Sequence, residues 1–281
     1  MRLGAHMSIV GGVDEAILRG HEVGCDTIQI FTRSPRQWRP RVLKDEEILH
    51  FQQNRERTGV RPVIAHDCYL INLGSPDEDL WRKSLGVLVE ELRHCEALDI
   101  PYLVIHPGSH VGTGEEVGLR RIAQALDQAC GEAKRRRVDI LLEITAGQGT
   151  NLGYSFAQLA QLLELVVDDS WLGICFDTCH AFAAGYELRT REGYEATFGE
   201  MDELIGLQRL KFIHLNDSKG DLGSRLDRHE HIGRGALGLE PFRMLLNDER
   251  FQELPMVLET PKGPKDKEDR ENLKVLRSLI R

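Results

Sequence analysis

Short apolar runs alternate with longer amphipathic stretches from one end of the chain to the other. Seven of the eight short runs contain Val or Ile, which is typical of buried parallel strands, whereas the first relies on Leu3 and Ala5. The predicted strands cover residues 2–6, 27–31, 62–66, 102–106, 140–144, 172–177, 210–215 and 256–260.

The stretches between these runs are predicted to be helices, because their apolar residues mostly recur every three or four positions. Leu80, Leu85, Leu88 and Leu92 illustrate this spacing in one stretch, and Ser155 is expected to cap another helix. The predicted helices cover residues 14–23, 46–57, 77–98, 115–136, 155–167, 191–204, 241–246 and 267–280.

Eight strand–helix units in this order predict a (β/α)8 TIM barrel that forms a single domain over residues 1–281, with its active site at the carboxyl ends of the strands. A doubly wound open sheet is the alternative fold. Two connecting segments, residues 31–43 and 216–239, each follow a predicted strand and therefore belong to this face of a barrel. The first is basic and contains Trp38, and the second is rich in Gly, Asp, Arg and His.

The composition, with 41% hydrophobic residues, fits a globular chain. No run of about 18 apolar residues occurs, so we expect no membrane span, and the N-terminus has no apolar signal core, so we expect a cytoplasmic protein with its six cysteines as reduced thiols. The net charge of −9 argues against a nucleic-acid partner without excluding one, since carboxylates that hold metal ions account for part of such acidity.

In six consecutive predicted strands, the last residue or the one before it has a side chain of a type that binds metals. Packing does not require this pattern, and burying an unpaired carboxylate is costly. A barrel would bring the six positions together around one axis, although they are far apart in the sequence. They are His66, His106, Glu143, Asp177, His214 and Glu259.

Imidazole together with carboxylate is the ligand mixture of zinc, manganese or iron sites. Three histidines and three carboxylates exceed the needs of one tetrahedral ion, so they indicate at least two ions bridged by a carboxylate, an arrangement that suits phosphoester or amide hydrolysis. His180, three residues after Asp177, and the pair Asp227 and His229 could hold a third ion. The predicted ligands thus number nine.

An isolated histidine at a strand end is more often structural than a ligand, and only the joint pattern reverses this expectation. Of the histidines outside the set, His6 is expected to be structural, His21, His50 and His94 to lie on helix surfaces, and His110 and His231 stay ambiguous. Cys175 and Cys179 are expected to pack as small apolar side chains rather than to bind metal.

Six motifs resemble the endonuclease IV family of apurinic/apyrimidinic (AP) endonucleases, and together they extend from residue 2 to about residue 261. The motifs are GAHMSIVGG, HPGSH, EITAGQG, FDTCHAFAAGY, HLNDSKGDLGSRLDRHEHIGRG and LETP. The resemblance implies a (β/α)8 barrel with three zinc ions, with Mn²⁺ as an alternative at part of the sites.

The resemblance also implies a role for each predicted ligand. His66 and His106 would bind the first zinc, Glu143 would bridge the first and second, and Asp177, His214 and Glu259 would complete the second. His180, Asp227 and His229 would hold the third. Glu143 and Glu259 are the expected catalytic residues, with Glu259 orienting or deprotonating the nucleophile.

The implied activity is hydrolysis of the phosphodiester on the 5′ side of an abasic site in double-stranded DNA, which leaves a 3′-hydroxyl and a 5′-deoxyribose phosphate, together with removal of 3′-blocking groups. A monomer is expected. Family members insert side chains into the minor groove at positions that correspond to Arg33, Arg36, Gln37 and Trp38, and at Tyr69. The alternative for Arg36 and Trp38 is an ordinary surface loop.

Arg225 and Arg228 are expected to contact phosphates, with structural ion pairing as the alternative. Ile144 departs from the family pattern, because a polar residue such as Asn is more common there, which puts one contact to a ligand in doubt. Two other functions compete: a sugar isomerase or epimerase on a similar barrel with one or two Mn²⁺ or Mg²⁺ ions, and a non-catalytic protein that binds damaged DNA.

Overall fold

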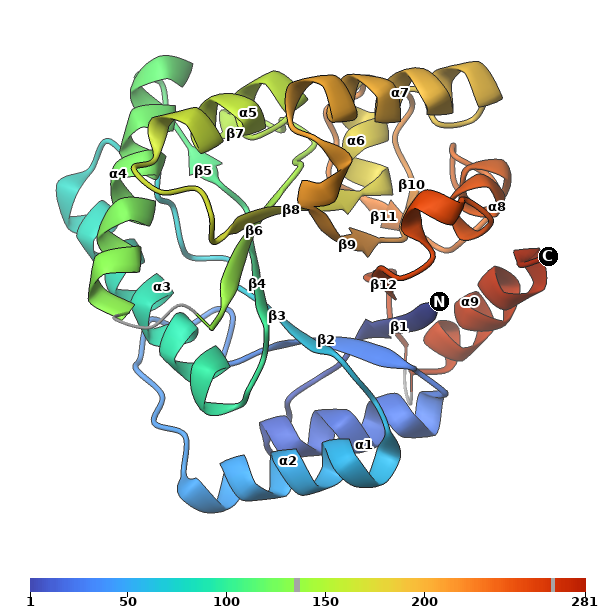
Figure 1. Ribbon diagram of the computed structural model, residues 1–281, viewed down its shortest axis with the longest axis horizontal. Coiled ribbons are helices and arrows are strands. Elements are labelled where there is room, and N and C mark those ends of the chain that lie inside the picture. Colours follow the sequence, from blue (N-terminus) through green and yellow to red (C-terminus); the bar gives the residue numbers. More distant parts are fainter. Residues whose placement is uncertain (134–136, 264–265) are drawn as a thin grey trace.

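Eight parallel strands close into a barrel in the computed structural model, which describes residues 1–133, 137–263 and 266–281 (Figure 1). The strand order around the barrel is β1-β12-β9-β8-β6-β4-β3-β2. The closed sheet confirms the predicted (β/α)8 barrel and rules out the open sheet. The barrel strands are β1 (Arg2–His6), β2 (Thr27–Phe31), β3 (Val63–His66), β4 (Tyr102–Ile105), β6 (Asp139–Glu143), β8 (Leu172–Asp177), β9 (Leu210–His214) and β12 (Pro255–Leu258).

Helices surround the barrel on its outside (Figure 1). Each predicted helix is present with bounds that differ by at most a few residues, and the predicted end of one helix at 134–136 lies outside the described residues. Ser155 caps its helix as expected, accepting a hydrogen bond from the backbone N–H of Gln158 at 3.2 Å. The helices are α1 (Val13–Val23), α2 (Asp45–Thr58), α3 (Glu78–Ala97), α4 (Glu115–Ala133), α5 (Phe156–Leu165), α7 (Arg191–Leu204), α8 (Glu240–Leu246) and α9 (Lys267–Leu279).

Inside the barrel, a small apolar cluster lies directly beneath the predicted ligands. Side chains two residues apart in a strand point to the same face. Each member of the cluster stands two residues before one of the six predicted strand-end ligands, so the ligands form the next layer above it. The cluster consists of Ile64, Val104, Leu141, Cys175, Phe212 and Val257, all fully buried.

Several short elements were not predicted, and most of them shape the loops above the carboxyl ends of the strands, whereas the two 3-10 turns at 207–209 and 249–251 precede β9 and β12 at the amino ends of those strands. The pair β10 and β11 is antiparallel and places Ser218 opposite His229, so the long loop after β9 folds back over the barrel. The short elements are β5 (Gly108–Ser109), β7 (Asn151–Leu152), α6 (Thr178–Ala184), η1 (Leu207–Arg209), β10 (Asp217–Ser218), β11 (His229–Glu230) and η2 (Glu249–Phe251).

Some sequence predictions need correction. The strand predicted over 256–260 ends at Leu258, and the one over 102–106 ends at Ile105, so Glu259 and His106 lie just beyond their strands. His94 is buried rather than on a helix surface, because its Nε2 bonds to the carbonyl of Arg41 at 2.9 Å. All six cysteines are free. Among the described residues, the helices are too short or too polar to cross a membrane.

Candidate metal centre

The structure brings all nine predicted ligands together at the carboxyl ends of the barrel strands. They fall into three groups, and within each group the potential ligand atoms all lie within 4.8 Å of one another. Parallel pairing of neighbouring strands produces this convergence, with Asp177 of β8 opposite His214 of β9. The groups are His66, His106 and Glu143; Glu143, Asp177, His214 and Glu259; and His180, Asp227 and His229.

Glu143 belongs to two of these groups and is fully buried between them. Its Oε2 lies 3.1 Å from His66 Nε2 and 3.4 Å from His106 Nε2. Its Oε1 lies 3.0 Å from His214 Nδ1 and 3.0 Å from His180 Nδ1. The two carboxylate oxygens therefore face different groups, which is the geometry of a bridging carboxylate.

His66 is oriented by its neighbour Asp67, a buried carboxylate that the sequence analysis did not single out. The Nδ1 of His66 lies 2.9 Å from the carbonyl oxygen of Asp67 and 3.2 Å from its Oδ1. Because these acceptors hold a proton on Nδ1, Nε2 is the nitrogen that faces Glu143. Metal-binding histidines are usually held in this way by an oxygen on the far side of the ring.

His214 has the opposite arrangement, with Nδ1 facing the other potential ligands. Its Nδ1 lies 3.0 Å from Glu143 Oε1, 3.4 Å from Glu259 Oε2 and 3.6 Å from Asp177 Oδ2. Its Nε2 bonds to the side-chain oxygen of Gln29 at 2.8 Å. The fully buried imidazole therefore directs one nitrogen toward three carboxylates.

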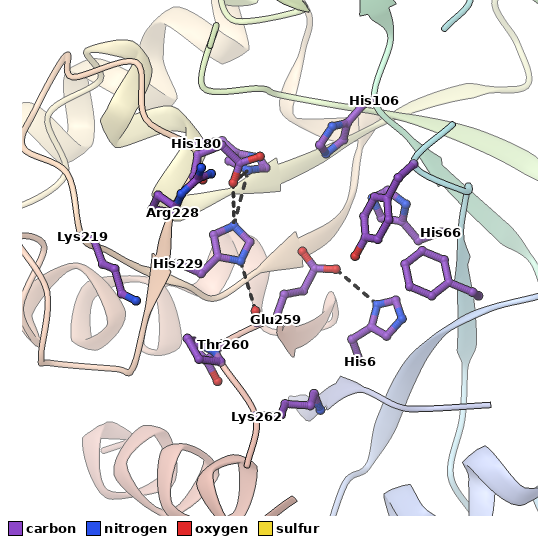
Figure 2. Close-up of a pocket in the computed structure, with 14 residues that line it drawn as sticks. His6, His66, His106, His180, Lys219, Arg228, His229, Glu259, Thr260 and Lys262 are labelled. Carbon is purple, nitrogen blue, oxygen red and sulfur yellow. Dashed lines mark hydrogen bonds and ion pairs between the residues drawn. The ribbon is translucent and has the colours of Figure 1, made fainter. Parts of the chain in front are cut away.

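Two amide side chains that the sequence analysis missed hold the carboxylates of this second group. Asn216 donates from Nδ2 to Asp177 Oδ2 at 2.7 Å, and its Oδ1 accepts from the backbone N–H of Glu259 at 2.8 Å. Gln29 donates to Glu259 Oε1 at 2.5 Å. His6 also reaches Glu259, with Nδ1 3.3 Å from Oε1, which agrees with its predicted structural role (Figure 2).

The third group is built on α6 and on β11. His180 donates from Nδ1 to the carbonyl of Ile144 at 3.1 Å, and His229 donates from Nδ1 to the carbonyl of Glu259 at 3.1 Å. The Nε2 atoms of both histidines then face Asp227 Oδ1, at 3.2 and 3.7 Å. A main-chain oxygen of Ile144 thus orients His180, so the apolar side chain at this position leaves that ligand supported.

Electrostatics keep the buried carboxylates ionised. Burial opposes the ionisation of Glu143, but the charges of His214 and His106 outweigh it and hold the pKa of Glu143 well below its usual range. The pKa of Glu259 is likewise held well below its usual range, because the charge of His214 and a hydrogen bond from His6 outweigh burial. Ionised carboxylates are the form that binds cations.

The histidines respond in the opposite direction. Burial works against the charged form of His66 and His180, yet the carboxylates around them raise the pKa of both rings well above the usual value. The positive charge of the protonated rings therefore offsets the negative charge of the carboxylates, as a bound divalent cation would. Four carboxylates and five imidazoles in contact fit divalent zinc or similar borderline ions, because such ions bind both ligand types and offset the buried negative charge.

Two buried cysteines also lie beside these groups. The Sγ atoms of Cys175 and Cys179 are within 4.8 Å of ligand atoms of His214 and His229, respectively, so distance alone would admit them as ligands. Burial raises the pKa of both thiols to about 12. A thiol rather than a thiolate favours the packing role expected from the sequence.

A cavity of about 480 Å³ opens above the ligands, and the close-up shows the side chains that surround it (Figure 2). Tyr69 and Arg228 line it together with Lys219 and Lys262. The two lysines were not singled out in the sequence. Lys219 lies within the long motif after His214, and its nearest carboxylate oxygen, on Glu230, is 3.9 Å away. The cavity therefore has carboxylates and histidines at its base and cations on its wall.

The remaining predicted DNA contacts lie on the outer surface, some of them packed against neighbours. Arg36 is exposed, and Tyr69 is 63% exposed. Trp38 is half-buried, with Lys83 Nζ 4.4 Å from the centre of its ring. Arg225 stacks on Tyr154 with its guanidinium carbon 4.0 Å from the ring centre. These positions leave charged and aromatic groups accessible around the cavity.

Arg33 does not lie where a DNA contact was expected. The side chain is 1% exposed and pairs with Glu90 of α3, with Nη1 and Oε2 3.1 Å apart. It also donates to the carbonyl oxygens of Gln37 and Arg39 at 3.1 and 2.6 Å. Arg33 therefore organises the loop from inside, and the expectation that it inserts into DNA is wrong.

The fold and the three groups of candidate ligands define a class of protein, a (β/α)8 barrel whose polar carboxyl-terminal face carries candidate metal ligands. A family model described as a xylose isomerase-like TIM barrel matches residues 18–279. Within this class, the chain belongs to the endonuclease IV family, and the protein is therefore an enzyme.

Individual relatives carry this assignment over nearly the whole chain. The chain is 55% identical over 279 residues to "Probable endonuclease 4" of Chloroflexus aurantiacus, an alignment that covers 99% of this chain and 98% of the relative. It is 39% identical to a crystal structure of endonuclease IV from Thermus thermophilus, with a TM-score of 0.88. That match covers 99% of this chain and 98% of the Thermus chain. A D-tagatose 3-epimerase-like structure has a TM-score of 0.74 at 20% identity over 99% and 97% of the two chains, which shows a shared fold alone.

Proposed function

We propose that the protein is a zinc-dependent endonuclease of DNA base excision repair that hydrolyses the phosphodiester 5′ to an abasic site, and that it also removes 3′-blocking groups. The observation that carries this proposal is Glu143, whose two oxygens face separate histidine groups. Neighbouring metal ions bridged by a carboxylate suit phosphodiester hydrolysis, because they act on both the attacking and the leaving oxygen.

Three zinc ions are assigned to the nine ligands, with Mn²⁺ as an alternative at part of the sites. His66 and His106 belong to the first ion, Asp177, His214 and Glu259 to the second, and Glu143 to both; His180, Asp227 and His229 belong to the third. When bound, such ions lower the pKa of a water molecule and neutralise charge on the phosphate and the leaving oxygen.

The chain's own contribution to the reaction centres on Glu259. Its carboxylate lines the cavity, and the charge of His214 and a hydrogen bond from His6 keep it ionised against the effect of burial. An ionised carboxylate in this position can accept a proton from an attacking water and orient it toward the phosphorus. Glu143 acts from beneath, where it fixes the spacing between the first and second groups.

DNA is proposed to bind across the carboxyl-terminal face, with phosphate contacts from Arg225 and Arg228. Arg36, Trp38 and Tyr69 are proposed to enter the minor groove, which supports a bent duplex with the abasic nucleotide extruded into the cavity. An unpaired abasic residue is the least costly nucleotide to extrude. The −9 net charge does not contradict this proposal, because the metal-binding carboxylates lie at the base of the cavity, while Lys219 and Lys262 lie on its wall.

The sugar epimerase alternative shares the barrel but does not account for the third group of ligands. The histidines of that group direct Nε2 atoms at Asp227, and a one- or two-metal enzyme has no use for them. A protein that only binds damaged DNA likewise needs no three-metal site. We further propose a monomeric cytoplasmic enzyme that consists of one catalytic domain.

Incision of a duplex that carries one tetrahydrofuran abasic analogue tests the proposed function. The protein purified without chelator should cut the analogue strand on its 5′ side and leave a 3′-hydroxyl, whereas an undamaged duplex of the same sequence should stay intact. Prolonged chelation should abolish incision, and added Zn²⁺ should restore it. Equal cutting of both duplexes, or full activity after removal of all metal, would contradict the proposal.

A further inference from the structure

Gln29 is an amide in the interior of the barrel, where β1 places His6 in register with it on one side and β3 places an apolar residue in register on the other. It is fully buried in the middle of β2, in register with Ile64 of β3, which belongs to the apolar cluster beneath the metal ligands. Burying an amide without partners costs free energy. Packing alone therefore gives no reason for a glutamine at this position.

The hydrogen bonds of the Gln29 side chain reach the candidate metal centre and the histidine beside it. Its Oε1 lies 2.8 Å from Nε2 of His214, and its Nε2 lies 2.5 Å from Oε1 of Glu259. The same Nε2 lies 2.9 Å from Nδ1 of His6. One side chain thus connects two residues of the second ligand group that come from β9 and from the end of β12.

The chemistry of an amide determines what each of these bonds does. The carbonyl oxygen of Gln29 only accepts, so His214 must carry a proton on Nε2, which makes Nδ1 the nitrogen that can bind a metal ion. Nδ1 lies 3.0 Å from Oε1 of Glu143. The N–H of Gln29 only donates, so it holds Oε1 of Glu259 as an acceptor while Oε2 stays 3.4 Å from His214 Nδ1. The reverse orientation of the amide would set its oxygen against the Glu259 carboxylate.

We propose that Gln29 is a positioning residue for the second ligand group: its single amide selects the His214 tautomer that can bind metal through Nδ1, and it fixes the rotamer of Glu259. The proposal rests on the proposed function for its catalytic readout alone, since metal retention and the tautomer can be measured without DNA. Loss of a residue that hydrogen-bonds to a metal ligand typically lowers metal affinity or activity by about 10- to 100-fold.

Two substitutions separate the two bonds. Gln29→Met has a similar length and removes both, whereas Gln29→Glu keeps an acceptor for His214 and places a carboxylate against Glu259. Gln158→Met is the matched control, because Gln158 is a buried glutamine of α5 that bonds to Gly153 and Glu115 and to none of the nine candidate ligands.

The first readout is metal retention against a chelator series. Gln29→Met should lose metal at about 10- to 100-fold lower chelator concentration than the unmodified protein. Gln29→Glu should recover much of that resistance, since its oxygen still accepts from His214. Nitrogen chemical shifts of ¹⁵N-labelled histidine in the zinc-loaded protein should report a proton on Nε2 of His214 in the unmodified protein and in Gln29→Glu.

The second readout is incision of abasic duplex. Both Gln29 variants should lower kcat by about 10- to 100-fold, with KM within about threefold of the unmodified protein, whereas Gln158→Met should retain kcat. Unchanged kcat and chelator resistance in Gln29→Met would overturn the proposal, as would a proton on Nδ1 of His214. If Gln29→Met does not fold, an unchanged kcat in Gln29→Glu overturns the part of the proposal in which Gln29 fixes the rotamer of Glu259. An unmodified protein that fails to incise would instead contradict the proposed function.

Discussion

His180 and His229 face each other through their Nε2 atoms, which lie 3.4 Å apart. Each ring donates its Nδ1 proton to a main-chain carbonyl, so both Nε2 atoms present lone pairs when the rings are neutral. Two lone pairs at this distance repel each other unless a proton or a cation lies between them. The pair is therefore the part of the third group whose geometry depends most directly on a bound ion.

Replacement of His229 should remove one ion from the protein. Metal analysis of the unmodified protein purified without chelator should find about three ions per chain, mainly zinc. His229→Asn should contain about one ion fewer and incise abasic duplex at least ~100-fold more slowly, because the third group loses a ligand. His231→Asn, two residues further on, is the control and should keep the full metal content. A full complement of ions in His229→Asn would contradict the assignment.

Glu259→Gln should separate binding from chemistry. The substitution keeps the shape of the side chain but removes the negative charge that accepts a proton, so kcat for incision should fall by about 10²- to 10⁴-fold. The Kd for abasic duplex should stay within about threefold, measured by fluorescence anisotropy. Glu253→Gln is the control, since Glu253 is exposed just before the start of β12, at the opposite end of the barrel. Unchanged turnover in Glu259→Gln would remove Glu259 from the reaction.

Arg36→Ala should weaken binding of abasic duplex and reduce its salt dependence. A cation that binds in the minor groove also displaces counterions from the DNA, so its loss lowers the slope of log K against log salt by about one. Titrations at several salt concentrations measure this slope. Arg61→Ala provides the comparison, because Arg61 is exposed next to the start of β3, away from the metal centre. Equal slopes for the Arg36 variant and the unmodified protein would show that Arg36 lies in an ordinary surface loop and does not contact the DNA.

Asp248→Asn should reduce stability in a pH-dependent way. Asp248 accepts from Tyr194 Oη at 2.8 Å and from Arg250 Nη2 at 2.6 Å. Burial opposes its ionisation, but the hydrogen bonds from Arg250 and Tyr194 outweigh burial and lower its pKa. The stability that the charge contributes is therefore complete above the unfolded pKa of about 3.9 and is lost as the pH falls through the lower folded value.

Urea denaturation should accordingly show a loss of about 1–3 kcal/mol in the free energy of unfolding of Asp248→Asn at pH 7. The difference from the unmodified protein should stay constant down to about pH 5 and shrink below about pH 4. Glu249→Gln, at an exposed position next in the chain, should leave the free energy of unfolding nearly unchanged. A difference that grows at acid pH would show that the sign of the pKa shift is wrong.

The sequence predicted the barrel because strand and helix patterns depend on local periodicity. Buried strands such as β8 are apolar on both faces, and the helices show an apolar stripe, so each element could be located to within a few residues. The candidate ligands were predictable for a related reason. A closed parallel barrel places the carboxyl ends of its strands at one rim, so a polar residue two positions after an apolar lumen residue such as Leu141 must face the axis.

Partners that are distant in the sequence account for what was missed or misplaced. Arg33 lies in a basic segment that suggests solvent exposure, and only the docking of Glu90 from α3 makes its burial favourable. His94 fits a helix surface by spacing, but the carbonyl of Arg41 covers it. Gln29 and Asn216 are amides whose significance depends on the carboxylates across the barrel. No local pattern distinguishes such residues from ordinary polar positions.

The closure of the barrel has a consequence for the order of events during synthesis. β1 pairs with β12, so the strand that precedes Glu259 is held by the first strand of the chain. His6 at the end of β1 then reaches the Glu259 carboxylate. A nascent chain that has not yet released β12 from the ribosome lacks both the last barrel strand and Glu259. Nuclease activity should therefore be absent from partial chains and emerge only once translation has passed the last strand.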